Sequence, residues 1–160
     1  MNKDSGFTAF EVAVALAIVA VIAAFATPPY LKWLRSYKLR GATTNLIADL
    51  EMAKIRAIRE NAFVAVQFAA DNYTIFVDNG EGGGTAGDWA RNGAERLIRN
   101  KDMPAGITID LANLTFANDR TRFNGRGLPP DVSIAERIPV TNAQDTKQIT
   151  INRLGFLHVQ

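Results

Sequence analysis

The fold is decided by the stretch FTAFEVAVALAIVAVIAAFAT, residues 7–27, in which Glu11 is the single charged residue. A helix rises about 1.5 Å per residue, so this run would extend about 30 Å, the thickness of the hydrocarbon core of a bilayer. The sequence therefore predicts one membrane-spanning helix close to the N-terminus.

A short polar leader, MNKDSG, precedes this run and ends at Gly6, directly before Phe7. A secretory signal peptide carries its small-residue cleavage site after the apolar run, whereas here the small residue comes first. A carboxylate such as Glu11 is costly in lipid unless it is paired. Cleavage after Gly6 would create an α-amino group on Phe7, and this cation could pair with Glu11 of a neighbouring copy. The leader and helix therefore indicate an assembly element rather than a simple anchor.

The order Gly6-Phe7-Thr8, then Glu11 and a long apolar helix, resembles the class III signal of type IV pilins and type II secretion pseudopilins. That family is cleaved between the glycine and the phenylalanine by prepilin peptidase, which also N-methylates the new terminus. The resemblance implies that Gly6 and Phe7 form the processing site and that Glu11 directs assembly. The chain departs from the family in having Ala9-Phe10 before the glutamate, where two aliphatic residues are usual.

The charges on the two sides of the span favour a different membrane orientation from the one that the family has. Lys3 is the one basic residue before the span, whereas four basic residues follow the span: Lys32, Arg35, Lys38 and Arg40. By the positive-inside rule alone the C-terminal side would stay in the cytoplasm, as in an ordinary signal anchor. The family has a cytoplasmic leader and an external domain, and we follow the resemblance. It implies a single-pass protein of the bacterial inner membrane with a periplasmic domain, which can be incorporated into a filament.

Length and composition restrict the remaining possibilities. The chain has 160 residues, room for one membrane helix and one small domain of about 100 residues. The net charge of +2, from 18 basic and 16 acidic residues, does not indicate a nucleic-acid partner. No cysteine is present, so neither a disulfide nor a thiolate metal site can form. Many pilins close their C-terminal loop with a disulfide, so within the resemblance this absence favours a pseudopilin or minor pilin.

The chain divides into four predicted segments. Residues 1–6 are the leader and residues 7–27 the transmembrane and assembly helix. Pro28, where the family usually has a proline, and Pro29 remove two backbone donors and predict a kink. Residues 28–62 form the amphipathic half of the helix, and residues 63–160 form an antiparallel β domain. Apolar residues at helical spacing predict the stripe that faces this domain: Leu39, Ala42, Leu46, Leu50, Ala53 and Ala57.

Beyond the helix the apolar period changes to two, which predicts strands. Residues 63–68 and 73–77 form a hairpin, and the Gly-rich residues 78–88 form an exposed, mobile loop. Further strands are predicted at residues 96–99, 107–111, 114–117, 121–123, 132–140, 148–152 and 156–159. The fold class is α+β, a long N-terminal helix packed on a small antiparallel β-sheet domain, and the resemblance implies the pilin fold.

Three segments make the resemblance closest to GspH/FimT-like minor pseudopilins. They are the helix-to-strand transition EMAKIRAIRENAFVAVQF at residues 51–68, the segment TRFNGRG at residues 121–127, and the terminal strand pair in residues 149–159. The resemblance therefore extends from the N-terminal signal to the β domain.

No catalytic or metal centre is predicted. His158 is the one histidine and cysteine is absent, so no nucleophilic triad or histidine cluster can assemble. We expect no enzyme activity, no cofactor and no metal. Asp78, Glu81 and Asp88 carry oxygens that suit calcium, but their spacing does not match the EF-hand loop. A flexible loop is the preferred interpretation.

A DNA-binding site is the main alternative for the basic residues. Some FimT-like minor pilins bind DNA through a Gly-Arg-x-Arg motif near the C-terminus, which makes four arginines candidates: Arg120, Arg122, Arg126 and Arg153. The corresponding strands here read RLGFLH at residues 153–158, with phenylalanine and histidine where that motif would place arginines. Phosphate contacts require several clustered cations, whereas these four arginines are scattered among acids such as Asp119 and Asp131. The sequence does not favour nucleic acid as a partner.

We predict a structural assembly subunit, a minor pseudopilin or minor pilin of a type II secretion system or type IV pilus, processed by prepilin peptidase. The expected partners are other pilins or pseudopilins in a filament or tip complex, the peptidase, the inner membrane and secreted cargo. The alternatives are a DNA-binding minor pilin for DNA uptake and a major pilin. The sequence leaves open whether the machine is a secretion system or a pilus.

Overall fold

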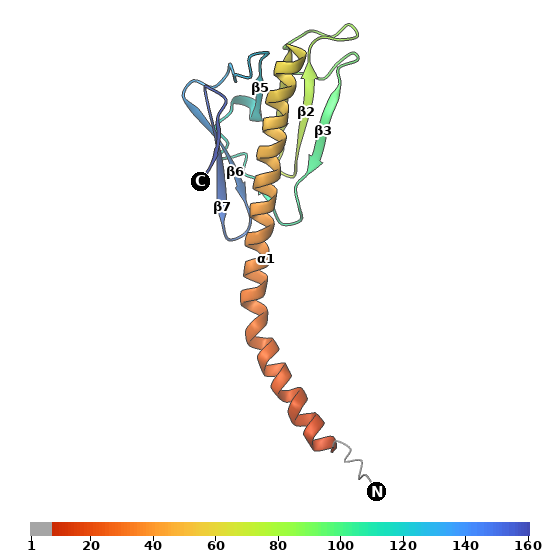
Figure 1. The fold of residues 1–160 in the computed structure, drawn as a ribbon, viewed down its shortest axis with the longest axis vertical. Helices are drawn as coiled ribbons and strands as arrows, with labels where there is room; N and C mark the ends of the chain where they lie inside the picture. The colour runs from red at the N-terminus through yellow and green to blue at the C-terminus, as the bar shows by residue number, and fades with distance from the viewer. Residues whose placement is uncertain (1–7) are drawn as a thin grey trace. The chain divides into compact units, whose positions relative to one another are not determined.

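The computed structural model describes residues 8–160. The chain divides into two compact units, Met1–Ser36 and Tyr37–Gln160. The one α-helix of residues 8–160, α1 (Ala9–Glu60), is drawn from red to yellow in Figure 1 and contributes residues to both units. The helix continues through Pro28 and Pro29. Beside them the Thr27 hydroxyl donates a hydrogen bond of 2.7 Å to the Ala23 carbonyl. The kink at the two prolines stays a prediction.

The helical stripe predicted from the sequence is buried. All six of its side chains are at most 4% exposed, and α1 also buries Thr43 and Asp49. The helix ends in a Schellman motif, in which Asn61 adopts a left-handed φ of 46°. The Asn61 amide donates to the Ile58 carbonyl and the Ala62 amide donates to the Ala57 carbonyl. This turn leads the chain directly into the first strand.

Two four-stranded antiparallel sheets form the second unit together with residues 37–60 of α1. The first has the order β3-β2-β1-β5 and the second the order β4-β6-β7-β8. Figure 1 shows β2 and β3 on one side of α1, and β6 and β7 on the other. The elements are β1 (Phe63–Phe68), β2 (Asn72–Asp78), β3 (Leu97–Asp102), β4 (Thr108–Ile109), the 3-10 helix η1 (Ala117–Asp119), β5 (Arg120–Phe123), β6 (Ala135–Thr141), β7 (Thr146–Asn152) and β8 (Leu157–Val159).

Both sheets share one core with the helix. Ile75 and Phe123 of the first sheet belong to the same buried cluster as Ile149 of the second, together with Leu46 and Leu50 of α1. The predicted α+β fold is therefore confirmed. Without the helix neither sheet could bury its inner face, because the stripe fills the space that the two sheets leave.

The strands predicted at residues 96–99 and 107–111 have other bounds in the structure, Leu97–Asp102 and Thr108–Ile109, and two further predictions differ more. Residues 114–117 form no strand: Phe116 is buried with its ring 6.1 Å from that of Phe68, and Asn118 adopts a positive φ of 55°. The strand predicted at residues 132–140 begins only at Ala135, because Val132 lies in a turn and donates to the Pro129 carbonyl. Alternating apolar residues do not distinguish a strand from a loop whose side chains reach the core.

Asp49 links α1 to the first sheet. Its buried carboxylate accepts a hydrogen bond of 2.5 Å from the Tyr73 hydroxyl and lies 3.2 Å from Nη2 of Arg99 and 3.4 Å from Nζ of Lys101. A buried carboxylate is stable only when donors replace the water that it has lost. Burial, together with this carboxylate acceptor, raises the pKa of Tyr73, so its hydroxyl remains the proton donor. These contacts fix the helix against β2 and β3.

Replacing Asp49 with alanine should lower the free energy of unfolding by about 2–3 kcal/mol, because the buried Tyr73 hydroxyl and two cations lose their acceptor. The matched control is Glu51→Ala on the same helix, which removes only a partly exposed ion pair with Lys54 and should cost less than about 0.5 kcal/mol. Chemical unfolding of the full chain in detergent measures both values. Equal losses for the two variants would contradict this role of Asp49.

Candidate functional site

The predicted processing residues, Gly6 and Phe7, lie outside the described residues. The predicted assembly residue, Glu11, lies in the first turn of α1. Its Oε2 accepts hydrogen bonds from the amide of Thr8, at 2.8 Å, and from the hydroxyl of Thr8, at 2.9 Å. The Glu11 amide donates in return to the Thr8 hydroxyl at 3.2 Å. This reciprocal arrangement is a capping box.

The capping box gives Glu11 a partner within its own chain. From the sequence, the expected partner of this carboxylate was only a cation from a neighbouring copy. The spacing of Thr8 and Glu11, which matches the pattern Ser/Thr-x-x-Glu, is the signal that would have revealed the cap. In the single chain, the Glu11 carboxylate therefore accepts a hydrogen bond from a free amide at the start of the helix. The carboxylate still carries a charge that can pair with a cation of a neighbouring copy.

The helix that follows Glu11 is apolar on every side. Residues 12–31 contain no charged side chain, and their large apolar side chains are exposed, such as Leu16 at 64% and Phe25 at 79%. A helix without a polar face is stable only when lipid or protein surrounds it. By length and composition, α1 is the one helix in the described residues that could cross a membrane.

The Gly-rich segment after β2 is held by two buried carboxylates. Asp78 is 0% exposed and accepts hydrogen bonds from the amides of Gly87, at 2.6 Å, and Trp89, at 3.1 Å. Glu95 is 3% exposed and accepts from the amides of Gly80, at 2.8 Å, and Asn92, at 2.9 Å. The predicted loop is present and largely exposed, but it is anchored at both ends.

These contacts bear on the calcium alternative. Both oxygens of Asp78 face backbone N–H donors, which position a carboxylate for hydrogen bonding and not for a cation. Asp88 is engaged in the same way by the Ala90 amide and the Asn92 side chain. Among the described residues, no group of three or more acidic or histidine side chains could hold a metal ion. Asp78 and Asp88 therefore hold the loop through hydrogen bonds within the chain, whereas the Glu81 side chain is exposed.

Trp89 fastens the loop to the first sheet. It adopts a left-handed φ of 69°, a strained conformation for a bulky residue. Its carbonyl accepts a hydrogen bond of 2.7 Å from Gln67, and its ring lies 4.7 Å from the Arg120 guanidinium and 4.2 Å from that of Arg122. Strain of this kind persists only where the surroundings over-determine the conformation. Here the Asp78 carboxylate and the two arginines supply that constraint.

The four arginines considered for DNA fall into two pairs. Arg120 and Arg122 stack on Trp89, and Arg122 also lies 3.3 Å from Asp131 and donates to the Gly87 carbonyl at 2.9 Å. Arg126 and Arg153 are exposed on two other turns. Because Arg122 is engaged in protein contacts, its charge is poorly placed to release counterions from a nucleic acid. DNA binding by the other arginines stays an untested alternative that the sequence does not favour.

Replacing Asp78 with alanine should release the Gly-rich loop, because the Gly87 and Trp89 amides lose their acceptor. Amide hydrogen exchange across residues 80–95 should accelerate at least tenfold, while β7 stays protected. Glu81→Ala in the same loop is the control, since the Glu81 side chain is exposed and this residue contacts the loop through its backbone amide and carbonyl. Unchanged exchange in the Asp78 variant would contradict the anchoring role.

The fold and the apolar helix together define a pilin-like protein. The chain belongs to the family described as type II transport protein GspH, whose model matches residues 42–155. The predicted family resemblance is confirmed. A pilin-like protein, PilA1 of Thermus thermophilus, is 27% identical in an alignment 165 positions long that covers 94% of each chain.

Solved structures show the same fold. Two crystal structures of the type IV minor pilin FimU from Pseudomonas aeruginosa match with TM-scores of 0.57 and 0.60. They are 13% and 14% identical, and the matches cover 76% and 80% of this chain and 91% and 92% of FimU. At such identities the similarity shows the pilin fold alone. Family and fold make this chain a pilin-like structural subunit and point away from an enzyme.

Proposed function

We propose that this chain is a minor pilin or pseudopilin, processed by prepilin peptidase and incorporated into a filament or tip complex of a secretion system or pilus. One observation carries the proposal: α1 is a single helix whose first half is apolar on all sides and whose second half completes the core of a GspH-family domain. Such a helix suits a subunit that is stored in a membrane and transferred into an assembly of similar helices.

In this mechanism residues 7–27 enter the inner membrane with the leader in the cytoplasm and the β domain in the periplasm. The peptidase cleaves between Gly6 and Phe7 and methylates the new terminus. The domain then contacts other subunits or secreted cargo. The leader sequence, the apolar helix and the family match support this order of events.

Glu11 acts twice in this mechanism. In the unassembled chain the two hydrogen bonds from Thr8 lower the cost of holding a carboxylate near lipid. During assembly the terminal ammonium of a neighbour's Phe7 approaches this carboxylate. At about 4 Å and an effective dielectric constant of about 20, the attraction is about 4 kcal/mol, enough to select one register of the helices.

Processing is tested by the intact mass of the full chain extracted from membranes of cells with and without prepilin peptidase. With the peptidase we expect loss of residues 1–6 and gain of one methyl group. Gly6→Val should leave an uncleaved precursor in the membrane, because the peptidase requires a small residue before the cleaved bond. Normal processing of this variant, or a retained leader in the unmodified chain, would contradict cleavage by prepilin peptidase at this site.

The charge of Glu11 can be separated from its capping role. Glu11→Gln keeps an acceptor for the Thr8 amide but removes the charge, whereas Glu11→Ala removes both. Both variants should insert into the membrane, and both should lose at least tenfold in incorporation, measured by immunoblot of assembled against membrane fractions. Thr8→Ala, which weakens the cap and keeps the charge, should retain most incorporation. If Glu11→Gln assembles normally, charge pairing is wrong and Glu11 is only a helix cap.

A further inference from the structure

A short stretch of α1 directly after its apolar run carries positive charge for which the proposed mechanism has no use. We call it the basic segment, and its members are Lys32, Arg35, Lys38 and Arg40, all of them exposed. No acidic residue occurs anywhere from residue 12 to residue 48. Without these four, the 18 basic residues of the chain fall to 14, against 16 acidic ones. The excess positive charge of the chain is therefore concentrated in this segment.

The chain does not supply anions for the basic segment. Lys32, Lys38 and Arg40 form no ion pair with any part of the chain that the structure describes. On α1 the acid before the segment is Glu11, about 30 Å away along the helix, and the acid after it is Asp49, which is buried against other cations. Like charges one turn apart on a helix repel each other. The segment is therefore stabilised by an anion from outside the chain.

The geometry of the helix places this segment at a membrane surface. The run without a charged side chain, residues 12–31, extends about 30 Å, which matches the hydrocarbon core of a bilayer. Lys32, Arg35 and Lys38 then follow at about 1.5, 6 and 10 Å beyond the edge of this core. The headgroup layer on each side is about 5–8 Å thick. Side chains on a helix tilt toward its N-terminus, so all three cations reach back toward the headgroups.

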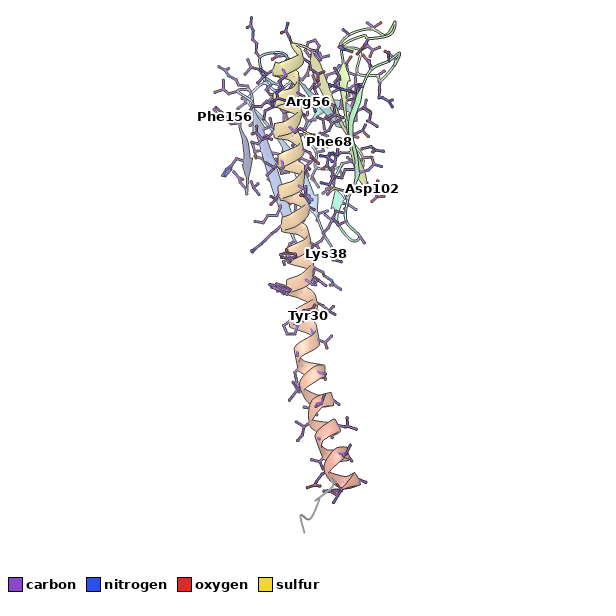
Figure 2. All side chains as sticks on the ribbon, turned by 45° about the vertical axis from the view of Figure 1, so that its right-hand side comes forward. Tyr30, Lys38, Arg56, Phe68, Asp102 and Phe156 are labelled. Carbon is purple, nitrogen blue, oxygen red and sulfur yellow. The ribbon has the colours of Figure 1, made fainter. Side chains whose placement is uncertain are left out.

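Two aromatic residues mark the same boundary. Tyr30 is 59% exposed and Trp33 is 60% exposed, and their ring centroids lie 6.1 Å apart. Tyrosine and tryptophan gather where hydrocarbon meets water, because each has an apolar ring and a polar tip. Figure 2 labels Tyr30 and Lys38, which are about two helical turns apart on α1. The aromatic pair and the basic segment therefore suit the same layer of a membrane.

The anion that fits this position is the headgroup of an anionic phospholipid. Such a headgroup brings negative charge and phosphate oxygens to the layer that the three cations reach, and basic side chains beside a membrane span are attracted to anionic lipids. An acidic protein or a nucleic acid would have to displace lipid in order to meet Lys32 at the edge of the hydrocarbon core. The depth of the segment therefore favours lipid over either macromolecule.

We propose that Lys32, Arg35 and Lys38 form a headgroup site for anionic phospholipid, on the side of the membrane where the chain continues to the β domain. This inference rests on the membrane anchoring in the proposed function and deepens it, because the orientation of the family assigns these lipids to the periplasmic leaflet. The positive-inside rule leaves cations on that side unexplained. Headgroup binding gives them a role, since it holds the unassembled chain at one depth in the bilayer.

The test uses the full chain in vesicles of phosphatidylcholine that contain a tenth part of phosphatidylglycerol, whose headgroup is anionic. Native mass spectrometry of the chain released from these vesicles counts the two lipids that it retains. We expect phosphatidylglycerol to be enriched at least fivefold over its share of the vesicle. Replacing Lys32, Arg35 and Lys38 together with glutamine, a good helix former, should abolish the enrichment. Enrichment that persists in this variant, or that is absent from the unmodified chain, would overturn the inference.

A second triple variant is the matched control. Arg126→Gln, Arg137→Gln and Arg153→Gln remove the same number of charges from exposed positions in the β domain and should leave the enrichment unchanged. Loss of enrichment in this control would mean that net charge, and not the basic segment, selects the lipid. Replacing chloride with inorganic phosphate at equal ionic strength should also have no effect. A loss caused by phosphate would indicate a site for the free ion and overturn the assignment to lipid.

Insertion of the chain is measured in parallel, as resistance to extraction from the vesicles by alkaline carbonate. An inserted chain that shows no enrichment counts against the headgroup site alone. A chain that carbonate removes counts against the membrane anchoring in the proposed function.

Discussion

The structure depends on a single helix, α1, whose first half suits an apolar environment and whose second half packs against the β domain. Residues after Glu11 are apolar on every side of α1, whereas residues 39–57 place one apolar stripe and one carboxylate, Asp49, against two sheets. Full burial of a leucine such as Leu46 or Leu50 contributes about 1.5–3 kcal/mol, so the stripe supplies much of the stability of a small domain. The domain therefore retains its part of α1 at all times, and only the apolar half is available to lipid or neighbouring helices.

Buried carboxylates fix two parts of the domain that apolar packing alone does not hold in place, the helix α1 against the first sheet and the Gly-rich loop. Asp49 fixes α1 against β2 and β3, while Asp78 and Glu95 hold the Gly-rich loop so that Trp89 covers the outer face of β1 and β5. Each carboxylate is matched by donors from its own chain. Arg59, Arg126 and Arg153 form no ion pair within the part of the chain that the structure describes, so their charges are available to another molecule.

The sequence predicted the features that depend on local periodicity. Helical spacing identified all six stripe residues, and alternation identified the β1–β2 hairpin. Asp49 was missed because its partner Lys101 lies 52 residues away, and no local pattern reports such a pairing. The glycine content predicted a loop but not the carboxylates that hold it. Asp78 holds the loop because the chain returns to it nine and eleven residues later, at Gly87 and Trp89, and no local pattern reports this return. The capping box of Thr8 and Glu11 was detectable from spacing, whereas the processing role of Gly6 and Phe7 stays a prediction.

The central claim, a minor subunit among dissimilar neighbours, is tested most directly by stoichiometry. Quantitative mass spectrometry of crosslinked cell envelopes and sheared surface fractions gives the abundance of this chain relative to each pilin-like protein bound to it. The account predicts that the chain is substoichiometric and is bound to a different, more abundant pilin-like subunit. A chain that is the most abundant subunit of a filament, or that has no pilin-like partner, would contradict it.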